Sequence, residues 1–357
     1  MKVAILGAGI SGLSCAKILE DNGITPTIFE KRRNVGDRFI SGEVFLDTLN
    51  RPIKDSFSYL ANEHKIFLQP VGNISELLIK SQNEKTTING TLGFSNSRGR
   101  IEDALEKQLL RQIKTKIIYN SKIDYEELKK DFTHIVIATG DGSYSEKQDN
   151  YITDFTVKLK GGVVKGKFSR NKVIAWLNNN YSPKGYSYMI PLSENLANIV
   201  IAYPDNNDEY DSDLLWDAFY KDAKKELNQE LPIEDLWSVS KYQIGKCKRP
   251  RIGNTFYVGN CYGSIMPFLG FGQFASILSG VYSAYDICGI DDYEKSLKNL
   301  ESSYKNSIIL RKGMEKLDND KFDMIVKRLD GIAGKLIFNK NTNFLNLISK
   351  AISPIIK

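Results

Sequence analysis

The chain has 357 residues, of which 41% are hydrophobic and 26% charged, and these values are ordinary for globular proteins. Its length favours two domains or a discontinuous domain, and its net charge of +6 is too small to predict nucleic-acid binding. Two histidines and four cysteines without a CxxC pair exclude a histidine-rich metal site and give no sign of a zinc or redox site, so we expect no metal. The sparse cysteines suit a reducing compartment, and we expect a cytoplasmic protein.

The N-terminus combines a strand, a glycine-rich turn and a helix. Residues 2–6 form an apolar run of the parallel-strand type, and Gly7-Ala8-Gly9-Ile10-Ser11-Gly12 follows it directly. Residues 13–19 then have helical spacing, and Gly23 ends the helix. The stretch also imitates a signal peptide, but it lacks a clear cleavage signal.

The next strand, 27–29, ends in Glu30, eighteen residues after Gly12. The order of strand, GxGxxG, helix, strand and acid predicts a dinucleotide site. Gly7 permits the tight turn, Gly9 lets a pyrophosphate approach the backbone, and Gly12 lets the helix pack close to the strand. Glu30 can accept both ribose hydroxyls of the adenosine. The alternative is a glycine-rich turn in an unrelated α/β domain.

The middle of the chain predicts a further buried strand and a second, mostly β, region. The buried strand spans 133–139 and closes in Gly140-Asp141-Gly142-Ser143. Beyond it, short alternating strands and one helix are predicted at 156–159, 173–176, 186–190, 199–202 and 211–227.

Residues 252–285 contain no charged side chain, a length that a hydropathy window would flag as a membrane span. The stretch also carries two asparagines, a glutamine, a proline and six glycines, which favours a buried, ligand-facing segment. We expect a strand over 256–259, a close-approach loop around Pro267, and an apolar helix over 274–285.

Four sequence blocks occur in the order of one flavoprotein family. The first is E-K-R-R-N-V-G-D-R-F-I-S-G-E at 30–43, and the others lie at 98–105, 185–200 and 259–280. In these blocks the chain resembles the geranylgeranyl reductase family, within the para-hydroxybenzoate hydroxylase fold group. It departs from the family pattern at Ser41, where the family usually has Cys, and at Asn260, where it has Asp.

The resemblance implies an α/β fold: an FAD-binding Rossmann-like domain of the hydroxylase type, with an inserted antiparallel β-sheet substrate domain and a helical C-terminus. It places the FAD-binding domain at 1–51, 95–151 and 246–290, the substrate domain at 52–94 and 152–245, and the helical region at 291–357. The block at 98–105 would begin a helix whose Arg98 reaches the cofactor. The FAD contacts expected are Gly7, Gly9, Ser11, Gly12, Glu30, Lys31, Ser41, Gly42, Arg98, Ile123, Gly142, Asn260, Pro267, Gly270, Gly272 and Gln273.

Tyr186 and Tyr188 lie two residues apart on a predicted strand and therefore share one face. The resemblance turns this face toward the cavity, so we expect Tyr188 to form an apolar wall and Tyr186 to carry a proton. Both tyrosines are the candidate catalytic residues. Ordinary core packing is the alternative for aromatic residues on a strand.

The resemblance implies an FAD-dependent reductase that acts on C=C bonds of an isoprenoid or another long apolar substrate. An external electron donor, NAD(P)H or ferredoxin, would supply the electrons. A flavin monooxygenase or halogenase acting on an aromatic or natural-product substrate is the first alternative, and a flavin-binding protein without activity is the second.

The C-terminal region from 291 is predicted to be helical and becomes basic and amphipathic after 334. A terminal helical pair packed on the body and a peripheral membrane contact are both open for this region.

Overall fold

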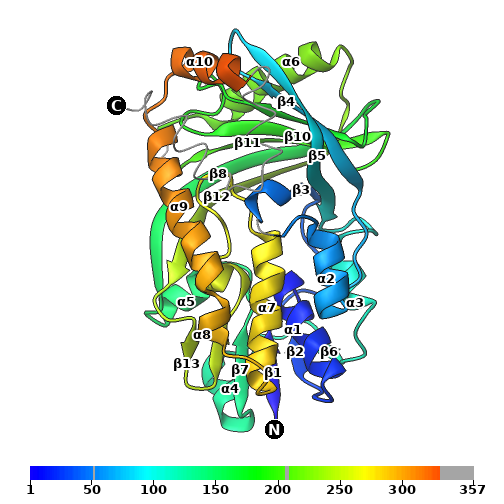
Figure 1. Ribbon diagram of the computed structural model, residues 1–357, viewed down its shortest axis with the longest axis vertical. Coiled ribbons are helices and arrows are strands. Elements are labelled where there is room, and N and C mark those ends of the chain that lie inside the picture. Colours follow the sequence, from blue (N-terminus) through cyan, green and yellow to red (C-terminus); the bar gives the residue numbers. More distant parts are fainter. Residues whose placement is uncertain (51–52, 206–208, 330–357) are drawn as a thin grey trace.

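The protein builds two β-sheets with helices around them, and the computed structural model describes residues 1–50, 53–205 and 209–329 (Figure 1). The smaller sheet lies in the half that contains the N-terminus, and the larger sheet crosses the other half. Helix α9 runs along one side of the molecule from one half to the other (Figure 1).

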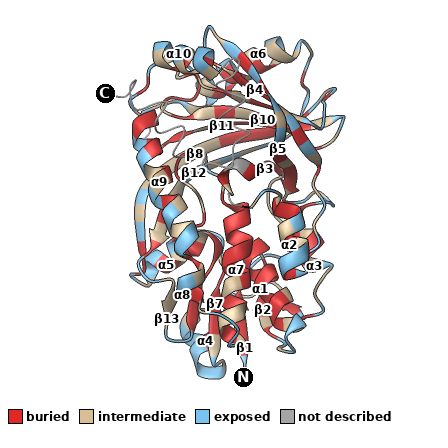
Figure 2. Cartoon of the chain, in the orientation of Figure 1, coloured by how far each residue is buried: buried red, intermediate tan, exposed pale blue. Residues whose placement is uncertain are grey.

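The smaller sheet is parallel apart from one edge pair, as expected for a dinucleotide-binding domain. Its six strands, in spatial order, are β13 (Arg251–Ile252), β14 (Thr255–Tyr257), β7 (His134–Ile137), β1 (Val3–Leu6), β2 (Thr27–Phe29) and β6 (Ile117–Ile118). Its helices include α1 (Ile10–Asp21), α3 (Leu105–Leu110) and α7 (Gln273–Ile287), with α1 packed against the other two. Figure 2 shows α7 buried over most of its length, which explains why its sequence carries no charge before Asp286.

The larger sheet has eight strands. In spatial order they are β12 (Ile233–Cys247), β8 (Tyr151–Lys165), β11 (Leu196–Pro204), β10 (Tyr186–Pro191), β9 (Lys172–Trp176), β4 (Gly72–Lys80), β5 (Lys85–Arg98) and β3 (Ser41–Leu46). The sheet is antiparallel as expected, except that β4 and β9 pair in parallel. The chain between these two strands passes through the other sheet, so no hairpin fixes their relative direction.

The remaining elements lie around the two sheets. They are η1 (Asp47–Leu49), α2 (Ser56–His64), α4 (Tyr125–Asp131), α5 (Ser143–Lys147), α6 (Ser212–Leu227), η2 (Gly259–Cys261), α8 (Tyr293–Ser296), α9 (Lys298–Met314) and α10 (Asn319–Leu329). Helices α4 and α6 begin at aspartate caps, Asp124 and Asp211, whose side chains accept from first-turn N–H groups.

Several predicted elements exist with different limits. The strand expected over 133–139 is the shorter β7, and the one expected over 156–159 is part of the fifteen-residue β8. The helix expected to start near Arg98 begins only at Leu105. Arg98 ends β5, Gly99 turns the chain with φ of 94°, and Ala104 is still extended, so the helix cannot start earlier.

The domain limits expected from the sequence do not coincide with the two sheets. β3, from the segment 1–51, pairs with β5 in the larger sheet from Ser41 opposite Arg98 onward. Conversely, Phe57 and Leu60 of α2, from the segment 52–94, pack in the core of the smaller sheet. Hydrogen-bond pairing and side-chain packing, rather than order along the chain, decide which half a segment joins.

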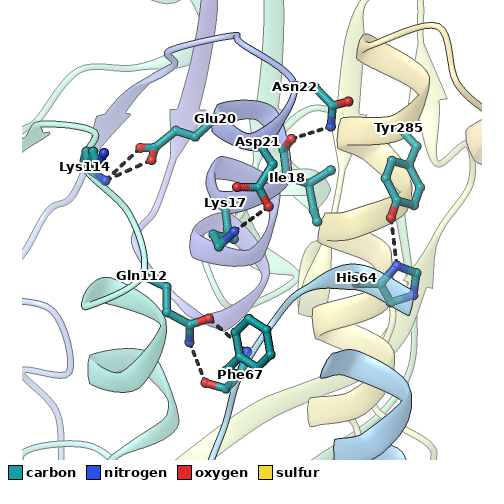
Figure 3. A network of polar contacts seen from close by, with 10 residues as sticks. All are labelled: Lys17, Ile18, Glu20, Asp21, Asn22, His64, Phe67, Gln112, Lys114 and Tyr285. Atoms are coloured by element: carbon teal, nitrogen blue, oxygen red, sulfur yellow. Dashed lines mark hydrogen bonds and ion pairs between the residues drawn. The ribbon is translucent and has the colours of Figure 1, made fainter. Parts of the chain in front are cut away.

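Polar contacts tie α1, α2 and α7 to the loops beside them (Figure 3). The amide of Gln112 accepts from the N–H of Phe67 at 2.9 Å and donates to its carbonyl at 2.7 Å, and Glu20 accepts from the N–H of Lys114. The imidazole of His64 on α2 lies 2.9 Å from the hydroxyl of Tyr285 on α7. These contacts fix the helices of the smaller sheet relative to one another.

Helices α9 and α10 close the larger half from the side. Met314, Phe322 and Val326 are buried in a core cluster together with residues of β4 and β9. The basic amphipathic stretch expected after residue 334 lies outside the described residues. Within the described part of the chain, no helix combines the length and apolar character needed to cross a membrane.

Candidate cofactor and substrate cavity

The three glycines of the first turn have different surroundings. Gly7 has φ of 115°, and a Cβ there would lie 2.2 Å from the carbonyl oxygen of Ala138; a Cβ at Gly12 would lie 2.1 Å from the carbonyl oxygen of Gly7. These two positions exclude a side chain because backbone meets backbone. Gly9 differs, since a Cβ there would meet nothing within 4 Å. The space above Gly9 faces the N-terminus of α1, where first-turn N–H groups lack helical partners and favour an anion.

Glu30 lies at the end of β2 and is buried, with 8% exposure. Its Oε2 accepts from the N–H of Ala8 at 2.8 Å, and its Oε1 accepts from the N–H of Arg32 at 2.9 Å. Each carboxylate oxygen keeps a further lone pair, so the group can still accept from a pair of ribose hydroxyls. Glu30 thus fixes the turn and presents an acceptor beside it.

A cavity of about 740 Å³ runs from this turn to the inner face of the larger sheet. Both halves of the protein contribute to its wall. The sequence-predicted residues that line it are Gly9, Ser11, Ser41, Gly42, Arg98, Tyr186, Tyr188, Asn260, Pro267, Gly270, Gly272 and Gln273. The tertiary structure therefore brings together residues from β3, β5, β10 and the loop before α7.

Six of the expected cofactor residues do not line this cavity. Gly7 and Gly12 shape the turn, and Glu30 lies behind it. Lys31 is exposed, and Ile123 is half-buried against the core of the smaller sheet. A Cβ at Gly142 would lie 2.4 Å from the ring of Tyr151, so this glycine serves close packing. For Lys31, Ile123 and Gly142 cofactor contact stays a prediction.

A buried ion pair stands at the polar end of the cavity. The Nε of Arg98 lies 2.8 Å from Oε2 of Glu106, and Oε1 of Glu106 accepts from the N–H of Gly99 at 3.0 Å. Burial by itself would raise the pKa of Glu106, but the adjacent Arg98 charge and the backbone donors hold that pKa below its ordinary value. The pair locks the end of β5 to α3 and holds Arg98 in the cavity wall.

Asn260 occupies the position where the resemblance expects Asp. Its amide nitrogen donates to the carbonyl of Gly140 at 2.8 Å and also to the hydroxyl of Tyr242. A carboxylate has no such donor, so the amide suits this environment better than Asp would. Asn260 lines the cavity, and its amide oxygen is an acceptor of the kind that a hydroxyl-bearing ligand needs.

Tyr186 and Tyr188 share the cavity face of β10, with ring centroids 5.8 Å apart. The hydroxyl of Tyr186 donates to the carbonyl of Leu269 in the loop before α7. Burial raises the pKa of both hydroxyls well above the ordinary value of 10.0. Both are therefore neutral at physiological pH.

The far end of the cavity is mostly apolar, and most of the side chains that line it were not predicted from the sequence. Alternate residues of β4, β8 and β9 contribute one wall, and α9 and α10 contribute the other. The lining side chains there are Ile74, Leu77, Ile79, Val157, Leu159, Val173, Ala175, Leu177, Phe268, Met314, Leu317, Phe322 and Ile325. Strand alternation predicted some of these faces, but no sequence signal placed α10 over them. Four residues that line the polar end had no role predicted from the sequence: Arg38, Glu43, Trp237 and Tyr242.

The residues present fit a bound dinucleotide. The open space above Gly9 gives room for a pyrophosphate, and the first-turn N–H groups of α1 can donate to it. The carboxylate of Glu30 can accept from a ribose. The described residues contain no group of three or more His, Cys, Asp or Glu side chains arranged to hold a metal ion.

Comparison with known proteins also indicates a dinucleotide-binding domain at the N-terminus. Residues 5–62 match the model of the NAD(P)-binding Rossmann-like domain. A 38-residue segment, 11% of this chain and 8% of the relative, is 55% identical to a 15-cis-phytoene desaturase of Synechococcus elongatus. The chain thus spans less than a tenth of that relative's length.

Solved structures resemble the whole chain. One is a geranylgeranyl bacteriochlorophyll reductase-like protein from Thermoplasma acidophilum, with a TM-score of 0.73 and 15% identity over 99% of this chain and 97% of that one. A flavin-dependent brominase gives a TM-score of 0.64 with 12% identity over 99% of each chain. A flavoprotein/dehydrogenase from Cytophaga hutchinsonii gives 0.63 with 16% identity over 100% of each.

The fold and the glycine turn define the class: this is an α/β protein with the fold of FAD-dependent reductases and hydroxylases. The fold expected from the sequence blocks is thereby confirmed, including its likeness to a geranylgeranyl reductase-like structure.

Glu30→Ala is expected to weaken FAD binding by about 1–3 kcal/mol, because it removes a buried acceptor from ribose hydroxyls and from two backbone N–H groups. Titration of the flavin-free protein with FAD, followed by flavin fluorescence, measures the change. Glu20→Ala is the matched control. Glu20 lies on α1 and also accepts from a backbone N–H, that of Lys114, but it does not line the cavity. An unchanged dissociation constant for Glu30→Ala would place the ribose elsewhere.

Proposed function

We propose that the protein is an FAD-dependent oxidoreductase that saturates C=C bonds of an isoprenoid or another long apolar molecule. The observation that carries the proposal is one continuous cavity, with the dinucleotide turn at one end and an apolar chamber at the other. The eight-stranded sheet then forms the substrate half. The likeness to a geranylgeranyl reductase-like structure supports this choice.

In this proposal, FAD supplies the hydride, and an external donor such as NAD(P)H or ferredoxin reduces it. The protein holds the pyrophosphate at Gly9 and Ser11 and offers the amide oxygen of Asn260 to a ribityl hydroxyl. Gln273 begins α7, whose N-terminus favours negative charge near it. The loop of Gly270 and Gly272 leaves room for a flat ring.

The apolar chamber binds and orients the substrate chain and excludes water. Burial of apolar surface contributes about 25 cal/mol per Å², so a long hydrocarbon chain gains most of its affinity there. Most side chains that line the chamber are apolar, and the charged ones on α9 and α10 are Arg311 and Arg328. Away from these two arginines, a polar aromatic substrate would leave its donors and acceptors unpaired.

A second candidate function is a flavin-dependent monooxygenase or halogenase. The likeness to a flavin-dependent brominase over 99% of both chains favours it, because the same fold then serves flavin-dependent bromination in that protein. The two functions differ in what oxidises the reduced flavin.

The test uses purified protein reconstituted with FAD and reduced without oxygen. Mixing with a polyprenyl alcohol should reoxidise the flavin and yield the saturated product, which mass spectrometry detects. Reoxidation by oxygen alone, with hydroxylated or halogenated product from an aromatic substrate, would support the second candidate. A protein that cannot be reconstituted with FAD would contradict both.

Tyr188→Ala is expected to slow turnover of the polyprenyl substrate about tenfold or more and to leave the FAD spectrum intact, because it removes an aromatic wall of the chamber. Tyr186→Phe is the matched control on the same strand face, since it removes only the bond to Leu269. Loss of FAD from Tyr188→Ala with unchanged turnover per flavin would instead assign Tyr188 to the structural core.

A further inference from the structure

Glu43 is a carboxylate in the wall of the cavity that the functional assignment above does not use. It lies on β3 directly after Gly42 and lines the cavity together with Tyr186 and Tyr188. Its Oε2 accepts from the side-chain amide of Gln273, the first residue of α7, and its Oε1 lies 3.5 Å from the hydroxyl of Ser41. These two contacts hold the carboxyl at the junction of β3, β10 and the start of α7.

The charged groups around Glu43 are Arg38, Arg98 and Glu106. Arg98 is committed to Glu106 at 2.8 Å, and among the described residues Glu43 makes no ion pair of its own. Burial raises the pKa of Glu43, and the nearby charges of Arg98 and Arg38 oppose this rise without cancelling it. The carboxyl therefore holds its proton more readily than an exposed glutamate does.

We infer that Glu43 is the proton donor of the proposed reduction, acting from the cavity wall at the junction of β3 and α7. This inference rests on the proposed function. A hydride, which carries two electrons, would add to one carbon of the C=C bond. The external donor, NAD(P)H or ferredoxin, would then reduce the flavin that supplied this hydride. The π-electron pair takes the proton from the Glu43 carboxyl, so a second C–H bond forms and the O–H bond breaks. Water then reprotonates the carboxylate.

Glu43 suits this role better than Tyr186, to which the sequence pointed. The hydroxyl of Tyr186 already donates to the carbonyl of Leu269, and burial makes it a still weaker acid than a free phenol. A carboxyl with a raised pKa is poised nearer to neutral pH, where proton transfer is efficient. The hydroxyl of Ser41 lies beside Oε1 of Glu43, which is the carboxyl oxygen that does not accept from Gln273.

The test compares Glu43→Gln, Glu43→Asp and the control Glu102→Gln, whose side chain is 79% exposed on the neighbouring turn. Anaerobic single-turnover oxidation of reduced FAD by a polyprenyl alcohol should slow by about 100-fold or more in Glu43→Gln and recover partly in Glu43→Asp. The wild-type rate should fall as pH rises through the Glu43 pKa, and Glu43→Gln should lose this dependence. FAD binding should be retained in all three variants.

A second measurement needs no flavin. Infrared spectra of the flavin-free protein, recorded as the pH rises, should show in wild type and Glu102→Gln the C=O band of a protonated carboxyl that persists above pH 4.5, and Glu43→Gln should lack this band. Absence of the band in wild type, or an unchanged rate in Glu43→Gln, overturns the role of Glu43 while the reductase assignment stands. If wild type itself fails to reduce any polyprenyl substrate, the proposed function fails, and the role of Glu43 falls with it.

Discussion

Gly9→Ala is expected to leave the protein folded with an unchanged melting temperature and to weaken FAD binding about tenfold or more, about 1.4 kcal/mol. The backbone at Gly9 is extended, with φ of −81°, so alanine adopts it without strain, and its Cβ meets no protein atom within 4 Å. The methyl group would occupy the space through which a pyrophosphate approaches the turn. Fluorescence titration with FAD and thermal unfolding of the flavin-free protein measure the two effects separately.

Gly280→Ala, on α7, provides the matched comparison. A Cβ at Gly280 would lie 2.1 Å from the carbonyl oxygen of Ser11, so α7 would have to move away from α1. We expect it to destabilise the flavin-free protein by about 1–3 kcal/mol, the range seen for overpacked cores. If Gly9→Ala lowered the melting temperature as much as Gly280→Ala, the space above Gly9 would serve packing rather than a ligand.

Glu106→Ala is expected to destabilise the protein by about 3–5 kcal/mol. The change leaves the Arg98 guanidinium buried without its carboxylate and the N–H of Gly99 without an acceptor. Because Arg98 lines the cavity, FAD affinity should fall as well. Urea unfolding measures the first effect and FAD titration the second.

Glu102→Ala is the control, because its contacts with Lys107 and Arg111 are exposed and such pairs contribute at most about 1 kcal/mol. The pH dependence gives an independent check. The folded-state pKa of Glu106 lies below its ordinary value of 4.5, so its stabilisation is complete above that pH and is lost as the pH falls further. Glu106→Ala should therefore lose stability less steeply in acid than wild type. Equal acid sensitivity of the two proteins would contradict a strong buried pair.

The sequence by itself determined the local features of the dinucleotide half. The run from β1 through the glycines to Glu30 is continuous along the chain, and each step follows from backbone sterics or periodicity over a few residues. Gly7 and Gly12 meet the backbone as their spacing predicts, and α7 is buried as its lack of charge predicts. The alternation of polar and apolar residues likewise predicted the strands around Tyr186, although β8 is much longer than the strand predicted over 156–159.

Only the tertiary structure decided which segments meet at the cavity. Glu43, Gln273 and Tyr188 come from three distant segments, and their proximity depends on how β3 joins the larger sheet and where α7 begins. The parallel pairing of β4 with β9 and the packing of α10 over the apolar chamber also join segments far apart in the chain. Local propensity carries no information about such contacts, because they are selected by the burial of whole sheet and helix faces against one another.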